Sequence, residues 1–173
     1  MKKIERPTTG EYAAHHEVYV LAAKGEDLGS ALRHAAEEED KVFAAVPKDR
    51  WEYRYAPGKW TIKEVFQHII DVERVFVYLA LAIARNDAND LPNLDEDAYQ
   101  AEARTDKRNI TDVMRELRAV RQATIELFEG LDDTALDRVG TVRGKHTTAP
   151  ALGWIIAGHA EHHLRIVRER YLS

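Results

Sequence analysis

The sequence contains no cysteine among its 173 residues. This absence excludes disulfides, thiolate metal ligands, iron–sulfur clusters and a cysteine nucleophile. Any metal ion that the chain binds must therefore be held by nitrogen and oxygen atoms, which histidine, aspartate and glutamate supply.

Long hydrophobic runs are missing as well. The longest uninterrupted apolar run, Val75–Ala84, is too short to span a bilayer. The basic segment Met1–Pro7 lacks the apolar region of a signal peptide. The sequence therefore predicts a cytoplasmic protein that has no membrane partner.

An excess of positive charge and the common phosphate-binding motifs are also absent. The formal net charge of -5 argues against a nucleic-acid partner. The local cluster of Arg165, Arg168 and Arg170 is typical of a solvated last helical turn. The glycines form no dinucleotide-binding fingerprint, no P-loop and no nucleophile elbow, so nucleotide binding and serine hydrolysis have no support.

What is present indicates a folded globular domain. Hydrophobic residues make up 45% of the chain and charged residues 32%, an apolar content that a disordered chain would lack. There is no internal repeat, low-complexity tract or Pro-, Gly- and Ser-rich linker. We therefore expect residues 1–173 to form a single domain, in which residues 1–26 are an N-terminal extension.

The apolar residues recur at helical spacing in four segments, whereas strand signals are nearly absent. The best-marked boundary is Thr61–Glu64, a capping box in which a threonine and a glutamate satisfy free backbone amides reciprocally. The pattern predicts an all-α protein, a four-helix bundle. Its predicted helices are Asp27–Val46, Thr61–Arg85, Ile110–Glu129 and Ala149–Tyr171, with a short additional helix at Tyr12–Ala22.

Two of the connections between these helices are long. The stretch Asn86–Arg108 can travel the length of a bundle, so the second and third helices need not be antiparallel neighbours. The stretch Leu131–Thr147 contains Gly140 and Gly144, which is compatible with a short helical turn or a small hairpin.

Three of the eight histidines fall on inward faces of predicted helices. At about 100° per residue, His159 and His163 share one face of the last helix with Leu152. His68 lies on the apolar stripe of the second helix, together with Val72. Two separate helices therefore direct imidazoles into the core.

A divalent metal ion is one partner that would satisfy these imidazoles. Burying three neutral imidazoles costs free energy unless each finds a partner. An ion held by His68, His159 and His163 would keep coordination positions open for water or substrate, which is typical of a catalytic site. One alternative is that these residues are core histidines bonded to backbone carbonyls. Another is that His159 and His163 lie on an exposed face of a helix whose true phase differs from the predicted one.

Four other polar residues lie near the same faces. His162 sits to one side of the histidine stripe. Glu38 or Glu39 can orient a ligand or act as a general base, although a solvated carboxylate is the more common reading. Asp71, one turn after His68, is either a partner of that ligand or an exposed side chain.

Two segments also resemble a known family. They are Pro57–Arg74 and Gly158–Arg165, accompanied by Leu94–Tyr99 and Arg168–Tyr171. Together they resemble the DinB/YfiT-like superfamily of metal-binding four-helix bundles, and the resemblance covers nearly the whole chain.

The resemblance implies an up-down-down-up bundle with a long crossover between the second and third helices. It also implies a metal triad, whose motif positions fall on His68, His159 and His163 in this sequence. Zinc and nickel are the metals usually associated with the family. In several members the function resembles transfer of a low-molecular-weight thiol such as bacillithiol or mycothiol, and the bundles are often homodimers.

These considerations lead to competing functional hypotheses. In the first, the chain is a divalent-metal-dependent thiol S-transferase that joins a small-molecule thiol to an electrophile. In the second, the same site activates water, and the chain is a metal-dependent hydrolase. In the third, the chain is a non-catalytic metal-binding domain of a stress response. The residues outside the triad contain no motif that separates these hypotheses.

Overall fold

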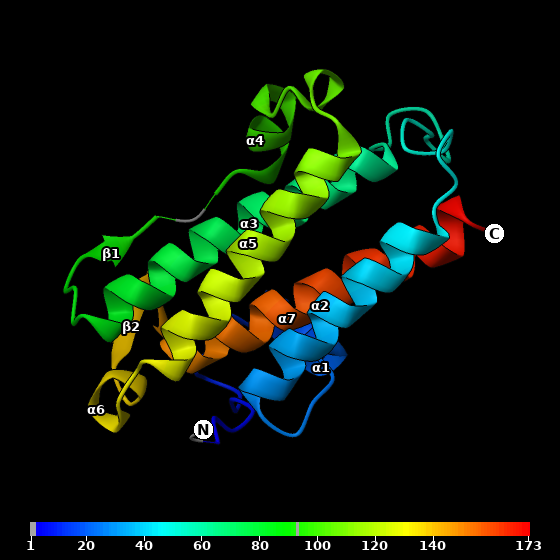
Figure 1. The fold of residues 1–173 in the computed structure, drawn as a ribbon. Coiled ribbons are helices and arrows are strands. Elements are labelled where there is room, and N and C mark those ends of the chain that lie inside the picture. The colour runs from blue at the N-terminus through cyan, green and yellow to red at the C-terminus, as the bar shows by residue number, and fades with distance from the viewer. Residues whose placement is uncertain (1–2, 93) are drawn as a thin grey trace.

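The computed structural model describes residues 3–92 and 94–173 and contains four long helices (Figure 1). These are α2 (Leu28–Ala45), α3 (Ile62–Ala84), α5 (Ile110–Glu129) and α7 (Ala149–Ile166), which continues into a π-helical turn, η3 (Val167–Tyr171). The shorter helices are η1 (Ala14–His16), α1 (Glu17–Ala22), α4 (Glu96–Glu102), η2 (Thr105–Lys107) and α6 (Asp133–Leu136). The predicted four-helix bundle is confirmed.

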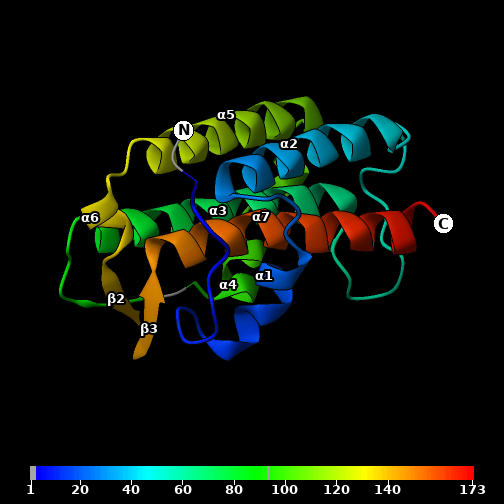
Figure 2. The same cartoon turned by 90° about the horizontal axis from the view of Figure 1, so that it is seen from below.

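The long helices follow the expected up-down-down-up order. Helices α2 and α7 run in one direction, and α3 and α5 run in the other (Figures 1 and 2). Helix α3 packs against α5 and α7, and α2 packs against the same two helices. The crossover between α3 and α5 must return along the bundle because these two helices are parallel.

Local capping interactions position the helix that carries His68. The backbone N–H of Thr61 donates to Glu64 Oε2 at 2.6 Å, and the N–H of Glu64 donates to Thr61 Oγ1 at 3.1 Å. At α2, the N–H of Ser30 donates to Asp27 Oδ1 at 2.7 Å. The predicted capping box is confirmed, and it fixes where α3 begins and hence which face His68 occupies.

The two long connections meet in a three-stranded sheet at one end of the bundle. Strand β1 (Asp90–Leu91) pairs in parallel with β2 (Val139–Val142), which pairs antiparallel with β3 (Lys145–Thr148). The second connection thus contains both features considered for it, a helical turn in α6 and a hairpin. The sequence pattern does not predict the parallel pairing of β1 with β2.

The N-terminal residues pack closely against α7. A Cβ atom on Gly158 would lie 1.7 Å from the carbonyl oxygen of Tyr19, so only glycine permits this approach of α1 to α7. Nearby, the Trp154 indole N–H donates to the carbonyl of Glu5 at 2.9 Å. Helix α1 therefore covers one side of the helix that carries His159.

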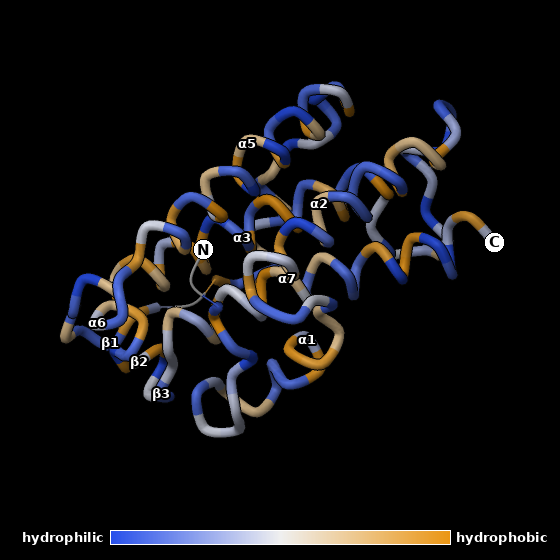
Figure 3. Tube along the Cα trace, turned by 60° about the horizontal axis from the view of Figure 1, so that its bottom comes forward, coloured by the Kyte–Doolittle hydropathy of each residue, from blue (hydrophilic) through white to orange (hydrophobic). Residues whose placement is uncertain are grey.

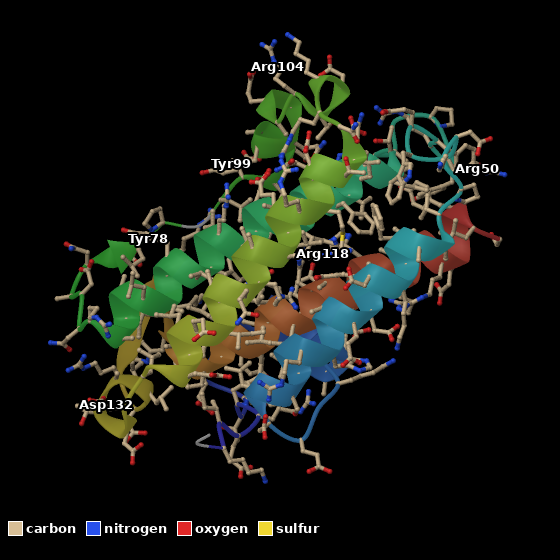
Figure 4. All side chains as sticks on the ribbon, viewed as in Figure 1. Arg50, Tyr78, Tyr99, Arg104, Arg118 and Asp132 are labelled. Carbon is tan, nitrogen blue, oxygen red and sulfur yellow. The ribbon has the colours of Figure 1, made fainter. Side chains whose placement is uncertain are left out.

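Hydrophobic and hydrophilic positions alternate along the helices of the bundle, as Figure 3 shows. Tyr78, Arg104 and Asp132 project outward, whereas Arg118 lies between α5 and α2 (Figure 4). There its Nε donates to Asp40 Oδ1 at 2.9 Å. Of the described helices, none combines the length and the apolar character needed to cross a membrane.

Candidate metal centre

His68, His159 and His163 come together inside the bundle. Each offers a ring nitrogen, and these three atoms all lie within 4.8 Å of one another. The Nε2 atoms of His68 and His159 are 3.0 Å apart. Both residues are 2% exposed, and His163 is half-buried. The antiparallel packing of α3 on α7 creates this cluster, because it places the first turns of α3 beside the last turns of α7.

The electrostatics of the three imidazoles favour their neutral form. Burial lowers the pKa of His68 to about 4. Burial also lowers the pKa of His159 and of His163 well below the ordinary value, and the neighbouring imidazoles lower them further. Neutral imidazoles present free lone pairs at pH 7. Three neutral nitrogen donors converging at this spacing fit the ligand set that zinc and other first-row divalent ions take.

Aromatic rings enclose the histidines on two sides. The Trp60 ring centroid lies 4.7 Å from that of His68. The Tyr19 ring lies 5.2 Å from His159 and 5.4 Å from His162, both in edge-on contact. His162 is thus beside the cluster, as expected, and outside the group of three converging nitrogens.

A carboxylate from the crossover also reaches the cluster. Glu96 Oε2, in the first turn of α4, lies 4.0 Å from His68 Nε2, and the Glu96 side chain is 53% exposed. Burial raises the pKa of Glu96, and the charge of Asp97 adds to the effect. Reasoning from the residues alone missed Glu96, because an irregular crossover has no periodicity that would aim its side chains. The only available signal was its place inside the family-like segment Leu94–Tyr99.

A cavity connects the cluster to the surface. Its volume is about 290 Å³, and its lining includes Trp60, Asp97, His163 and Tyr171. His163 is the member of the triad that this cavity reaches. A small ligand can therefore approach His163 from this side.

Glu39 lies elsewhere in the core and has a different role. It is 1% exposed, and Arg121 Nη2 donates to its Oε1 at 2.9 Å. The same guanidinium donates to both carboxylate oxygens of Glu73, at 3.0 and 2.8 Å. Burial raises the pKa of Glu39, the charge of Arg121 lowers it, and the charge of Glu73 raises it further. The expectation of a solvated carboxylate is wrong for Glu39, which belongs to a buried ion cluster.

The other two carboxylates singled out from the sequence also bind other partners. Glu38 Oε1 accepts from Lys41 Nζ at 2.7 Å, and its Oε2 accepts from Arg168. Asp71 is half-buried, and its Oδ1 accepts from Gln67 Nε2 at 2.9 Å. Neither carboxylate is grouped with the three histidines.

A sequence model of the DinB superfamily matches residues 26–167, which include all three histidines. The chain belongs to the DinB superfamily. None of the curated proteins compared with this DinB-superfamily chain matches it.

Two solved structures share the fold. One is YfiT from Bacillus subtilis, which is described as a probable metal-dependent hydrolase with an unusual four-helix bundle topology. The two structures have a TM-score of 0.70 and 13% sequence identity, and the alignment covers 96% of this chain and 91% of YfiT. A mycothiol-dependent maleylpyruvate isomerase has a TM-score of 0.67 at 11% identity, covering 80% of this chain and 58% of the isomerase. At these sequence identities the structural similarity establishes the fold of the DinB-superfamily chain. It does not establish which reaction, if any, the chain catalyses.

Proposed function

We propose that this DinB-superfamily chain is a divalent-metal-dependent enzyme that transfers a low-molecular-weight thiol to an electrophile. We further propose that His68, His159 and His163 hold the ion. The observation that carries the proposal is the set of three neutral imidazole nitrogens within 4.8 Å of one another, reached by a cavity. Imidazole ligands suit both zinc and nickel.

The residues around the cluster support this chemistry. A divalent ion bound there would lower the pKa of a coordinating thiol and favour the thiolate. Trp60 packs against His68 and Tyr19 packs against His159, so aromatic rings flank the imidazoles. Glu96 Oε2 lies 4.0 Å from His68 Nε2, where it can accept the proton of an incoming thiol. The fold shared with a mycothiol-dependent isomerase supports a thiol as the nucleophile.

A hydrolase is the second candidate. The fold shared with YfiT, described as a probable metal-dependent hydrolase, favours it. The same three imidazoles would hold the ion, and water would replace the thiol as the nucleophile. The predicted homodimer and the third hypothesis, metal binding without turnover, stay predictions.

Metal content tests the triad. Purified protein should contain about one divalent ion per chain, and the variant His159→Ala/His163→Ala should lose it. The matched control is His146→Ala/His162→Ala, which removes two histidines outside the triad and should keep the metal. If the triad variant retains stoichiometric metal, the proposed ligands are wrong.

Turnover distinguishes the candidate reactions. Conjugation of monochlorobimane with several low-molecular-weight thiols, measured with and without a chelator, should show metal-dependent transfer. Ester hydrolysis measured under the same conditions tests the hydrolase. If hydrolysis alone depends on the metal, the thiol-transfer proposal is overturned in favour of the hydrolase. If neither reaction depends on it, the chain is a metal-binding protein without these activities.

A further inference from the structure

A second cavity lies at the sheet end of the bundle, away from the three histidines. Its volume is about 210 Å³, and it is enclosed by the segment around η1, by α3, by the β2–β3 hairpin and by α7. Phe76 and Leu79 of α3 and Leu152 of α7 are buried and form its apolar part. No aspartate or glutamate is among its lining residues.

Two cations stand at the mouth of this cavity. Arg143 and Lys145 are exposed residues of the β2–β3 hairpin that line the cavity, and neither has an ion-pair partner among the residues that the structure describes. Burial lowers the pKa of His16, another lining residue, to about 4, so its imidazole is neutral at pH 7. Arg143 and Lys145 place positive charge at the mouth, beside the apolar interior.

The backbone at Arg143 is unusual for the residue that occupies it. Arg143 has φ 48° and Gly144 has φ 72°, the two positive values of a two-residue hairpin turn in which asparagine and glycine are strongly preferred. The Arg143 N–H donates to the carbonyl of Leu91 at 3.0 Å, and the Gly144 N–H donates to Asp90 Oδ1 at 2.9 Å, so contacts to β1 hold this turn. A non-glycine residue at positive φ costs free energy, which directs attention to what the Arg143 side chain can bind.

The second cavity and the triad are neighbours along the same two helices. Phe76 follows His68 by about two helical turns on α3, and Leu152 precedes His159 by about two turns on the antiparallel α7. The His16 ring contacts Phe76 at 5.6 Å between centroids. His16 and Phe76 thus form one wall of the second cavity.

We propose that the second cavity binds a small organic carboxylate. Arg143 and Lys145 would bind the anionic group, and Phe76, Leu79 and Leu152 would contact the apolar body. The cavity is smaller than typical drug-sized sites of roughly 300–1,000 Å³, so the ligand is small. This inference goes beyond the proposed function, because no triad histidine lines the cavity and binding there needs no metal.

Binding of phenylacetate to the full chain in the presence of a chelator tests the proposal, with uncharged phenylacetamide as the matched probe. Calorimetry should show phenylacetate binding at least about tenfold more tightly, since one charge-assisted contact is worth that much. The variant Arg143→Gln/Lys145→Gln should lose this preference, and Lys48→Gln/Lys107→Gln, with the same change in net charge at other exposed positions, should keep it.

Two further variants distinguish a loss of charge from a loss of cavity volume and from a loss of stability. Ala13→Leu, which fills the cavity from the segment before η1, should weaken both probes. Arg143→Gly should weaken phenylacetate binding while raising Tm by about 2–4 °C, because glycine adopts this turn without strain. Equal affinity for the two probes, or unchanged phenylacetate affinity in the double variant, would overturn the proposal. Because these measurements are made in the presence of a chelator, either result is independent of the metal-content and turnover tests of the proposed function.

Discussion

Replacing His68 by glutamine should flatten the pH dependence of stability in the metal-free protein. Burial lowers the pKa of His68 to about 4 in the folded state, whereas the side chain titrates near 6.5 in the unfolded chain. Above pH 6.5 the imidazole is neutral in both states. Between pH 6.5 and 4 only the unfolded chain takes up the proton. The free energy of unfolding therefore decreases as the pH is lowered through this range.

The size of this effect follows from the two pKa values. Lowering the pH from 7 to 5 should remove about 2 kcal/mol from the free energy of unfolding of the parent protein through His68 alone. His68→Gln lacks this contribution and should lose about 2 kcal/mol less over the same interval. Glu39 acts in the opposite direction, because its raised pKa means that the folded state gains protons first. It is present in both proteins, so its effect cancels in the comparison.

Urea unfolding at pH 7 and pH 5 in the presence of a chelator measures these differences, with tryptophan fluorescence as the signal from the chain's 3 tryptophans. His146→Gln is the matched control, because His146 is exposed on the hairpin, and it should follow the parent. Equal losses of stability in the parent and in His68→Gln would refute the argument that the buried imidazole is held neutral.

Three more perturbations have defined outcomes. Arg121→Met should lower the free energy of unfolding by about 3–5 kcal/mol, because it leaves two buried carboxylates without their cation; a loss near zero in urea titrations would contradict this. Glu96→Gln should weaken divalent metal binding about tenfold in chelator competition, because Glu96 Oε2 lies 4.0 Å from His68 Nε2; the neighbouring change Asp97→Asn should weaken it less. Gly158→Ala should destabilise the fold by about 3 kcal/mol and expose the N-terminal segment to limited proteolysis, because the added methyl group would overlap the backbone of α1. Intact proteolytic resistance in that variant would disprove the close packing.

The parts of the fold that depend on local interactions were predictable from the sequence. The predicted Ile110–Glu129 coincides with α5, and the predicted Asp27–Val46 and Thr61–Arg85 exceed α2 and α3 by one residue at each end. These outer residues are the caps, whose side chains interact within one helical turn. Helical phase depends on nearby residues too, and it placed the three histidines on inward faces.

Interactions between distant segments were not predictable in the same way. The sheet has strands of two to four residues, too short to show alternation, and β1 and β2 belong to different connections. The burial of Glu39 cannot be inferred from its neighbours in sequence, because its partner Arg121 lies on another helix, 82 residues away in sequence. Its location becomes apparent only when α2 packs against α5.

The helices position the three histidines, whereas the connections supply other charged residues. A shared bundle therefore need not imply a shared reaction. The up-down-down-up order makes α3 and α7 antiparallel neighbours, so their phase alone brings His68, His159 and His163 together. Glu96 and Arg143 come from the crossover and the hairpin, whose lengths and sequences can change without moving that trio. A relative at 13% identity can therefore share the bundle while its loops carry different charges. Residues that distinguish one family member from another are therefore expected in the segments that connect the helices.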